Sequence, residues 1–285
     1  MSWQLAITLH LIFTAIFALV QRNISRQFQS HARVGTAFFY PIVLTMGIIY
    51  GVLNYDISFD FSLQTWLFLV ANGFIFALSF ISAFKANSHV DAAQFAILQS
   101  TRAIFTVIIA SILLGEQLSV LQFLGVLVLV VSAGLVAVRR TTARTFNIST
   151  WSWLAIFSAF TLALATTGEK YFLGEMNVGT YMIIGWGFQT LAVMLLAFGR
   201  WHTLKDFGPS GIKQLVYLGI LRGLQGITFV IALSQADISL IAGIMSYQTV
   251  LIFVGGIIFL HEREHLYRRF AGSMIATVGL LLLVS

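Results

Sequence analysis

Cysteine is absent from this 285-residue chain, proline occurs only twice, and charged residues make up only 9% of the sequence. Without cysteine there can be no disulfide, thiolate nucleophile or cysteine-ligated metal site. Soluble domains carry about 25% charged residues, so this chain has too little charge to cover a water-soluble globule of its size. Because 59% of the residues are apolar, the composition excludes aqueous enzymes, nucleic-acid-binding domains and disordered tails, and it indicates a membrane protein.

Long apolar runs fill the sequence. A hydrocarbon core of about 30 Å requires roughly 20 apolar residues per helix, and the runs show no alternation with a period of two, which favours helices over strands. Trp3–Val20 lacks a basic leader and a small-residue cleavage site, so we expect a retained helix. The ten predicted spans are Trp3–Val20, Val34–Leu53, Trp66–Phe84, Ala92–Leu114, Val120–Val138, Trp151–Gly168, Val178–Phe198, Ile212–Leu233, Ile238–Leu260 and Phe270–Val284.

The loop charges predict an orientation. The formal net charge is +6, and the basic residues cluster in alternate loops between the spans. These clusters are Arg22, Arg26 and Arg33; Lys85; Arg139, Arg140 and Arg144; Arg200, Lys205 and Lys213; and Arg263, Arg268 and Arg269. The positive-inside rule therefore places both termini outside. The clusters are expected to face the cytoplasm and anionic lipid rather than nucleic acid.

The two halves of the chain resemble each other. A shift of 146 residues places Asp91 on Asp237, Ser100 on Ser246 and Glu116 on Glu262. Each half then contains five spans, and because five is odd, the second half is expected to insert with the opposite orientation. We therefore predict an all-α membrane protein of ten transmembrane helices in two inverted five-helix repeats. The first repeat covers residues 1–138, a connecting loop covers 139–150, and the second repeat covers 151–285.

Two segments in this arrangement resemble a known family. LLGEQLSVLQFLGVLVLVVSAGLV, from Leu113 to Val136, and its weaker partner FLHEREHLYRRFAGSMIATVGLLLLV are similar to the paired motif of the drug/metabolite transporter (DMT) superfamily, in its ten-helix EamA-type branch. The resemblance covers essentially the whole chain. It implies a metabolite transporter of the bacterial inner membrane, with the third, fourth, eighth and ninth helices lining a central cavity. In that family both termini usually lie inside, whereas the loop charges here predict the reverse.

Two arginines are expected deep in the membrane. A charge near the bilayer centre costs at least about 2.5 kcal/mol, yet Arg102 and Arg222 fall near the middle of the fourth and eighth spans. No acid is expected at that depth. The acid nearest to it is Glu169, which falls at the outer end of the sixth span. Its neighbour Lys170 is expected to form a local ion pair with it. A net positive core favours an anion or the carboxylate of a zwitterion, since an arginine holds two oxygens and stays protonated. The alternative is that Arg102 binds buried backbone carbonyls or an unwound helix end.

Polar neighbours of these arginines complete a predicted binding site. Gln99 shares a helix face with Arg102, and Gln248 is the repeat equivalent of Arg102, next to Tyr247. We expect Arg102 to bind the substrate carboxylate, Gln99 and Gln248 to orient it, and Tyr247 to stack or form a hydrogen bond. Each polar residue could instead join helices. Further candidates are Arg222, Gln225, Ser246 and Gln94, His10 for proton coupling, and, as weaker candidates, Trp186, Gln189 and Asn72.

Small residues four positions apart predict close helix packing. Such pairs are Gly47 with Gly51 and Gly219 with Gly223. Each pair would let two helix backbones approach within the membrane.

One motif points to a different class of protein. His261-Glu262-Arg263-Glu264-His265 has the spacing of a zinc-binding helix, but it falls in a charged turn, and no phosphate-binding loop or catalytic triad accompanies it. We therefore expect no metal, no cofactor and no enzymatic activity.

These observations predict a secondary transporter of a small anionic or zwitterionic metabolite, such as an amino acid or organic acid, that works by alternating access. Its expected partners are the substrate and the lipid bilayer, and it is expected to be a monomer or homodimer. Three alternatives stay open at this point. They are an exporter of amphipathic drugs or other metabolites, a non-transporting membrane receptor or assembly subunit, and a membrane enzyme.

Overall fold

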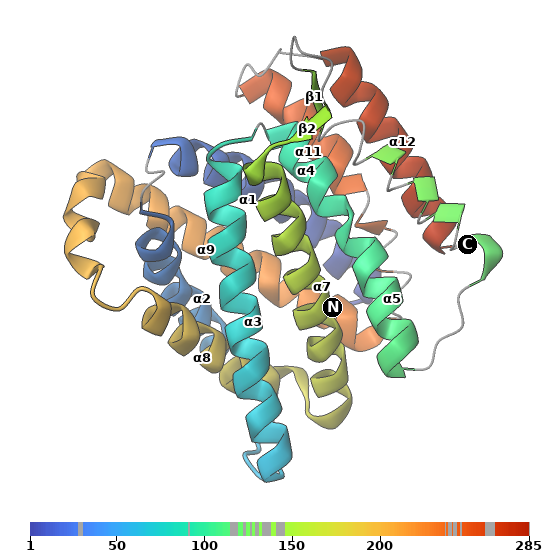
Figure 1. Cartoon of the computed structure of the whole chain (residues 1–285). Helices are drawn as coiled ribbons and strands as arrows, with labels where there is room; N and C mark the ends of the chain where they lie inside the picture. Colours follow the sequence, from blue (N-terminus) through green and yellow to red (C-terminus); the bar gives the residue numbers. More distant parts are fainter. Residues whose placement is uncertain are drawn as a thin grey trace.

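The computed structural model describes the chain except residues 28–30, 91, 115–118, 122–123, 126, 129–130, 133–137, 141–145, 237, 239–240, 242–243, 246, 260–265 and 285. The described residues form a bundle of helices (Figure 1). The helices are α1 (Trp3–Gln27), α2 (Ala32–Asn54), α3 (Leu63–Asn87), α4 (Ala92–Ser100), α5 (Arg102–Leu114), α7 (Thr150–Glu175), α8 (Val178–Leu196), α9 (Gly208–Gln235), α11 (Tyr247–Phe259) and α12 (Leu266–Val284). A 3-10 helix, η2 (Trp201–Phe207), precedes α9, and β1 (Val138–Arg140) pairs antiparallel with β2 (Phe146–Ile148).

Short polar residues determine where several helices begin. Ser62, Ser149 and Asn177 precede α3, α7 and α8 in extended backbone conformation. The side chain of each accepts a hydrogen bond from the backbone N–H three residues later, at 3.2, 3.1 and 2.8 Å respectively. The first N–H groups of a helix have no partner within it, so these caps fix the start of each helix.

Seven segments of the described chain are long and apolar enough to cross a membrane. They confirm the first, second, third, fourth, sixth, seventh and eighth predicted spans. The first and sixth end later than predicted, at Arg26 and Glu175, and the eighth begins earlier, at Trp201. Large apolar side chains such as Leu53, Ile112 and Phe198 are exposed on the outside of the bundle, where a soluble protein would rarely place them together. The chain is therefore a multi-pass membrane protein. The fifth and ninth spans lie partly outside the described residues, so the count of ten helices and the inverted repeat stay predictions.

The helices of the two halves pack against each other rather than forming separate bundles. The largest helix–helix contacts join α1 to α9, α3 to α7 and α2 to α8, and Figure 1 shows α3 and α7 side by side. A central space can therefore receive side chains from both halves of the sequence.

The predicted glycine contacts are confirmed. A Cβ atom on Gly47 would lie 2.5 Å from Cε3 of Trp186, and one on Gly51 would lie 3.0 Å from the backbone oxygen of Gly179. On α9, a Cβ on Gly223 would lie 2.4 Å from Sδ of Met46. These glycines let α2 approach α8 on one side and α9 on the other, as small residues do in membrane bundles.

Candidate functional site

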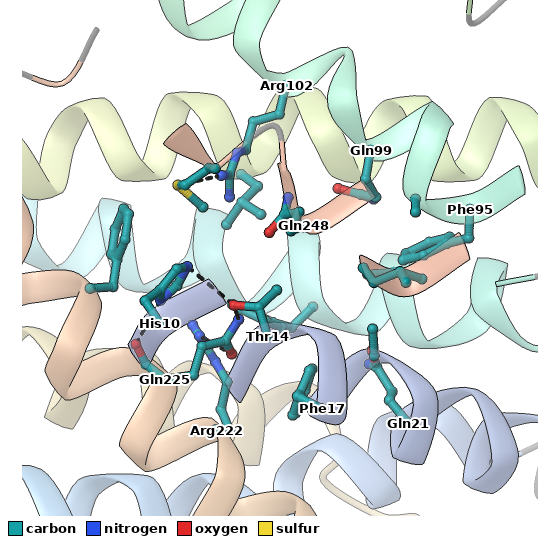
Figure 2. Close-up of a pocket in the computed structure, with 18 of the residues that line it drawn as sticks. His10, Thr14, Phe17, Gln21, Phe95, Gln99, Arg102, Arg222, Gln225 and Gln248 are labelled. Atoms are coloured by element: carbon teal, nitrogen blue, oxygen red, sulfur yellow. Dashed lines mark hydrogen bonds between the residues drawn. The ribbon is translucent and has the colours of Figure 1, made fainter. Parts of the chain in front are cut away.

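A large cavity lies between helices of both halves. Its empty volume is about 980 Å³, which includes space open to the surroundings. In Figure 2, Arg102 points into this cavity from one side, while His10, Gln225 and Arg222 lie on the opposite side. The cavity therefore brings together residues that are more than 200 positions apart in the sequence.

Each lining helix contributes one face. From α1 the cavity receives His10, Thr14, Phe17 and Gln21, which follow the spacing of a single helical stripe. The same spacing holds on α3, α7 and α9, whose lining side chains are Phe76, Phe80, Ala83 and Asn87; Leu162, Thr166 and Glu169; and Arg222, Gln225 and Phe229. The sequence analysis expected the third, fourth, eighth and ninth spans here. The first and sixth spans, α1 and α7, line the cavity as well.

Arg102 begins a new helix at a break in the fourth span. The hydroxyls of Ser100 and Thr101 donate hydrogen bonds, both 2.7 Å long, to the backbone oxygens of Ile97 and Leu98. These bonds lie next to a one-residue turn at Thr101, between the end of α4 at Ser100 and the start of α5 at Arg102. Arg102 follows this turn and lines the cavity.

The Arg102 guanidinium has few hydrogen-bond acceptors among the described residues. Nη2 donates a hydrogen bond of 3.2 Å to Sδ of Met245, and a thioether sulfur is a weak acceptor. Among the described residues this is the one hydrogen bond of a group that carries five N–H donors, and no described carboxylate lies within 4.0 Å of it. Arg102 donates to no backbone carbonyl among the described residues, and its role in binding stays a prediction.

Arg222 lies on the other side of the cavity and has a partly satisfied guanidinium. Nη1 donates a hydrogen bond of 2.8 Å to Oε1 of Gln225, and the guanidinium carbon lies 4.4 Å from the centre of the Phe80 ring. Its Nε is buried and has no hydrogen-bond partner among the described residues. Gln225 and Phe80 therefore hold the group in place without neutralising its charge.

His10 belongs to a hydrogen-bonded network with Thr14 and Gln225. Nδ1 of His10 lies 2.9 Å from the backbone oxygen of Gln225, Nε2 lies 3.2 Å from the Thr14 hydroxyl, and that hydroxyl accepts a 2.8 Å bond from Nε2 of Gln225. A backbone oxygen can only accept, so this arrangement assigns the proton of a neutral imidazole to Nδ1. Both ring nitrogens are thus engaged, and the role of His10 in proton coupling stays a prediction.

Glu169 is the residue that the sequence analysis placed wrongly. Because α7 continues to Glu175, Glu169 lies well inside the helix, is 3% exposed and lines the cavity. Lys170 does not pair with it. Its Nζ instead donates hydrogen bonds of 2.8 and 3.1 Å to the backbone oxygens of Leu233 and Ala236 at the end of α9.

The physical reason lies in helix geometry. Adjacent residues point about 100° apart around a helix, so Glu169 and Lys170 face different neighbours. The position of Glu169 could have been predicted from its spacing to Leu162 and Thr166, because this spacing places all three side chains on one helix face. The expectation that the core lacks an acid is therefore wrong.

Three further predicted residues lie on α4 and α11. Gln99 lines the cavity and donates a 3.2 Å hydrogen bond to the backbone oxygen of Ala155, with a second bond to the Ser158 hydroxyl. Gln248 also lines the cavity. Gln94 instead donates to the Ser152 hydroxyl at 3.4 Å and joins α4 to α7.

The remaining candidates lie elsewhere or cannot be placed. Tyr247 is the first residue of α11, but its side chain is outside the described part, as is Ser246. Trp186 and Gln189 line a second, smaller cavity. The side chain of Asn72 packs against Gly168. The motif of His261 and His265 also falls outside the described residues, and within those that are described no group of three metal-ligating side chains occurs.

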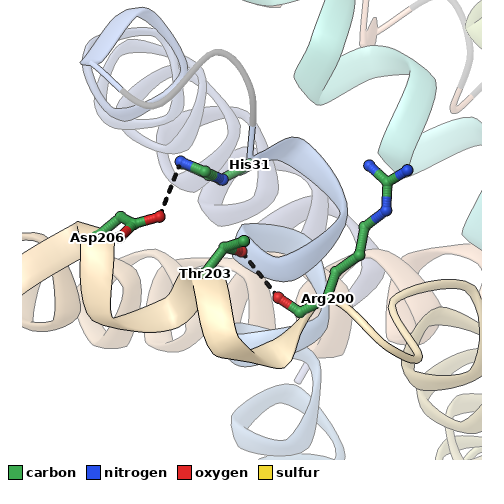
Figure 3. A network of polar contacts seen from close by, with 4 residues as sticks. All are labelled: His31, Arg200, Thr203 and Asp206. Carbon is green, nitrogen blue, oxygen red and sulfur yellow. Dashed lines mark hydrogen bonds and ion pairs between the residues drawn. The ribbon is translucent and has the colours of Figure 1, made fainter.

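A separate polar network connects η2 to the start of α2 (Figure 3). Nε2 of His31 lies 3.4 Å from a carboxylate oxygen of Asp206, and the Thr203 hydroxyl donates a 2.9 Å bond to the backbone oxygen of Arg200. None of these residues lines the large cavity. We therefore assign this network to the connection between α8 and α9 rather than to ligand binding.

A polytopic helical bundle with a cavity of buried polar side chains between its two halves has the architecture of a membrane transporter. The sequence matches the EamA-like transporter family over residues 1–138 and 149–285, and the chain belongs to this family. A curated relative from a Sinorhizobium species, described as "Uncharacterized transporter in cobO 3'region", is 26% identical over 137 residues, which is 48% of this chain and 97% of that protein. The family points to a transporter rather than an enzyme.

A solved structure shares the fold. It is described as "Crystal structure of protein", is 17% identical in sequence, and superposes with a TM-score of 0.66 over 97% of this chain and 96% of the other.

Proposed function

We propose that this protein is a secondary transporter that moves a small anionic or zwitterionic metabolite, such as an amino acid or organic acid, by alternating access. The observation that carries this proposal is the Arg102 guanidinium, which faces the cavity with a sulfur atom as its hydrogen-bond partner among the described residues. A guanidinium binds a carboxylate through two parallel hydrogen bonds. A substrate carboxylate would supply the acceptors that the described protein does not.

Two features support the alternating-access part of the proposal. The family match falls into two stretches, 1–138 and 149–285, as two repeated units would produce. In such a repeat α1 corresponds to α7, and α3 corresponds to α9. The contact between α1 and α9 is then equivalent to the contact between α7 and α3, and both are among the largest in the bundle. Transporters with inverted repeats expose a central site to each side in turn. We accordingly propose ten helices in two inverted repeats, with both termini outside.

The rest of the cavity suggests how a substrate is held. Gln99 and Gln248 lie beside Arg102 and would orient the carboxylate, while Arg222 provides a second positive charge. The apolar part of the substrate would contact phenylalanine side chains. These are Phe17, Phe76, Phe80, Phe95 and Phe229.

The same phenylalanines favour one other candidate, an exporter of amphipathic drugs. Aromatic rings attract cations as well as apolar groups, so a lipophilic cation could use them. The two arginines would repel such a cation. Charge selectivity therefore separates the two candidates.

The test is efflux from proteoliposomes loaded with a mixture of amino acids, organic acids and lipophilic cations, analysed by mass spectrometry against protein-free liposomes. We expect selective efflux of one carboxylate class. Charge-assisted hydrogen bonds contribute about 1.5–3 kcal/mol, so Arg102→Ala should lower transport about 10- to 150-fold. Arg102→Lys should be intermediate, because it keeps the charge and loses the planar fork.

Arg200→Ala is the matched control, because Arg200 is exposed and does not line the cavity. Equal loss in both alanine variants would contradict the assigned role of Arg102. Efflux of cations alone would favour the drug exporter, and saturable binding without efflux would favour a receptor.

A further inference from the structure

The proposed substrate contacts leave one buried acid unused. Glu169 lines the large cavity and also a second, smaller cavity, whose empty volume of about 310 Å³ includes space open to the surroundings. Phe76, Arg222 and Phe229 line both cavities too. Glu169 and Arg222 therefore lie at the boundary between the two spaces.

Charged and titratable groups face Glu169 from several helices. Arg222 on α9, Arg102 on α5 and His10 on α1 line the large cavity together with Glu169. Tyr181 on α8 contacts Glu169 through its hydroxyl, and Tyr40 on α2 lines the second cavity with it. The lining side chains that α3 and α4 contribute are not titratable, and on α7 itself Lys170 turns away to α9.

Glu169 nevertheless has no salt bridge to the part of the chain that the structure describes, because no Lys, Arg or His nitrogen there lies within 4.0 Å of its carboxylate. A buried carboxylate without a paired cation is costly to keep ionised. A proton is the simplest partner that removes this cost.

The smaller cavity places other polar groups around Glu169. The Tyr40 hydroxyl and Nε of Arg222 are buried there without hydrogen-bond partners among the described residues. Gln189 also lines this space and bonds to the Tyr181 hydroxyl at 3.4 Å. These polar groups are hydrogen-bond partners for a water molecule, and water can deliver a proton to Glu169.

We propose that Glu169 is the proton-binding site of this transporter and that its protonation is coupled to the binding of a carboxylate substrate at Arg102 and Arg222. This inference rests on the proposed function. An ionised Glu169 offsets part of the arginine charge and repels a second carboxylate. When a proton from the aqueous phase adds to a Glu169 oxygen, both guanidiniums become available to the substrate.

The coupling is reciprocal, because a bound carboxylate favours the protonated form of Glu169 by the same factor. Proton and anion therefore bind together and are released together on the other side. The transport mode is symport.

The test uses the purified full-length protein in lipid nanodiscs and two probes. Hydrocinnamate carries a carboxylate and a phenyl ring, and phenylalanine is the same compound with an added ammonium group. Calorimetry in two buffers with different heats of ionisation counts the protons taken up when each probe binds. Glu169→Gln removes the acid, and Glu175→Gln at the exposed end of α7 is the matched control.

We expect the wild type and Glu175→Gln to take up as much as one proton per hydrocinnamate. Their affinity should fall about tenfold per pH unit once Glu169 is ionised, as linkage to one proton requires. Glu169→Gln should take up none and should bind with the affinity that the wild type reaches in acid. If Glu169→Gln does not fold, Glu169→Asp should keep proton uptake and shift its pH profile.

Three results would overturn the proposal. The first is unchanged proton uptake in Glu169→Gln. The second is tight binding of phenylalanine, without hydrocinnamate binding, that Glu169→Gln abolishes, because Glu169 would then bind the ammonium group. The third concerns the infrared band of a protonated carboxylic acid, which is assigned to Glu169 if Glu169→Gln removes it. The proposal fails if this band does not change with pH in the wild type without a probe. If neither probe binds the wild type while this band titrates, the proposed substrate class fails and the proton site stands.

Discussion

Trp186 lies in a slot formed by glycines of two other helices, and this slot allows a sharp test of the packing. The Trp186 side chain on α8 is 4% exposed and lines the smaller cavity next to Glu169. A Cβ on Gly47 of α2 would lie 2.5 Å from Cε3 of its ring, and a Cβ on Gly226 of α9 would lie 3.0 Å from Cη2. Gly47→Ala therefore cannot be accommodated unless the ring moves.

Two opposing effects determine the expected change in the free energy of unfolding. Overpacking a buried site costs about 1–3 kcal/mol, while replacing glycine by alanine inside a helix contributes about 1 kcal/mol of stability. Gly187→Ala isolates the second effect, because Gly187 lies within α8 and a Cβ there would meet no atom within 4 Å. We expect Gly47→Ala to be less stable than Gly187→Ala by about 1–3 kcal/mol.

The assay is reversible unfolding in mixed micelles, followed by circular dichroism. A double-mutant cycle with Trp186→Leu tests the contact directly, since shortening the side chain should remove most of the cost of Gly47→Ala. Equal stability of the two alanine variants, or a cost of Gly47→Ala that persists in the Trp186→Leu background, would refute this account of the slot.

Two further predictions concern the ends of helices and the orientation of the chain. Lys170→Met should lower the free energy of unfolding by about 1–2 kcal/mol, because it removes a charged donor from the C-terminal carbonyls of α9. The control is Lys213→Met, an exposed change near the start of α9, which should be close to neutral. Equal losses in the two variants would contradict the role of Lys170 as the C-terminal cap of α9. Because the chain has no cysteine, Ser58→Cys and His202→Cys provide single labelling sites in the exposed loops before α3 and α9. A membrane-impermeant thiol reagent added to intact cells should label the first and not the second, and the opposite pattern would reverse the orientation derived from the loop charges.

The sequence was sufficient for seven of the predicted membrane spans, because their physics is local. A helix that crosses a bilayer must satisfy its own backbone and present apolar side chains over its whole length, so each span appears as a run of apolar residues. The caps at Ser62, Ser149 and Asn177 are equally local. The depth of Arg102 and Arg222 follows from the same reasoning, since both fall near the middle of a span.

Neighbours across the bundle could not be predicted in this way. The sequence places Glu169 beside Lys170, and only the packing of α7 decides that the carboxylate lines the cavity while the ammonium group caps α9. The contact between Arg102 and Met245 joins residues 143 positions apart. The apolar runs give no information about which helix faces meet.

The sequence by itself thus determined that the chain crosses the membrane many times and carries two deep arginines. The tertiary structure decided that the arginines share one cavity with a buried acid, and that α1 and α7 help to form it. The physical reason is that burial in lipid constrains every residue of a span independently. A binding site depends instead on how helices from both halves rotate and approach one another, and glycine contacts and side-chain volumes determine that arrangement.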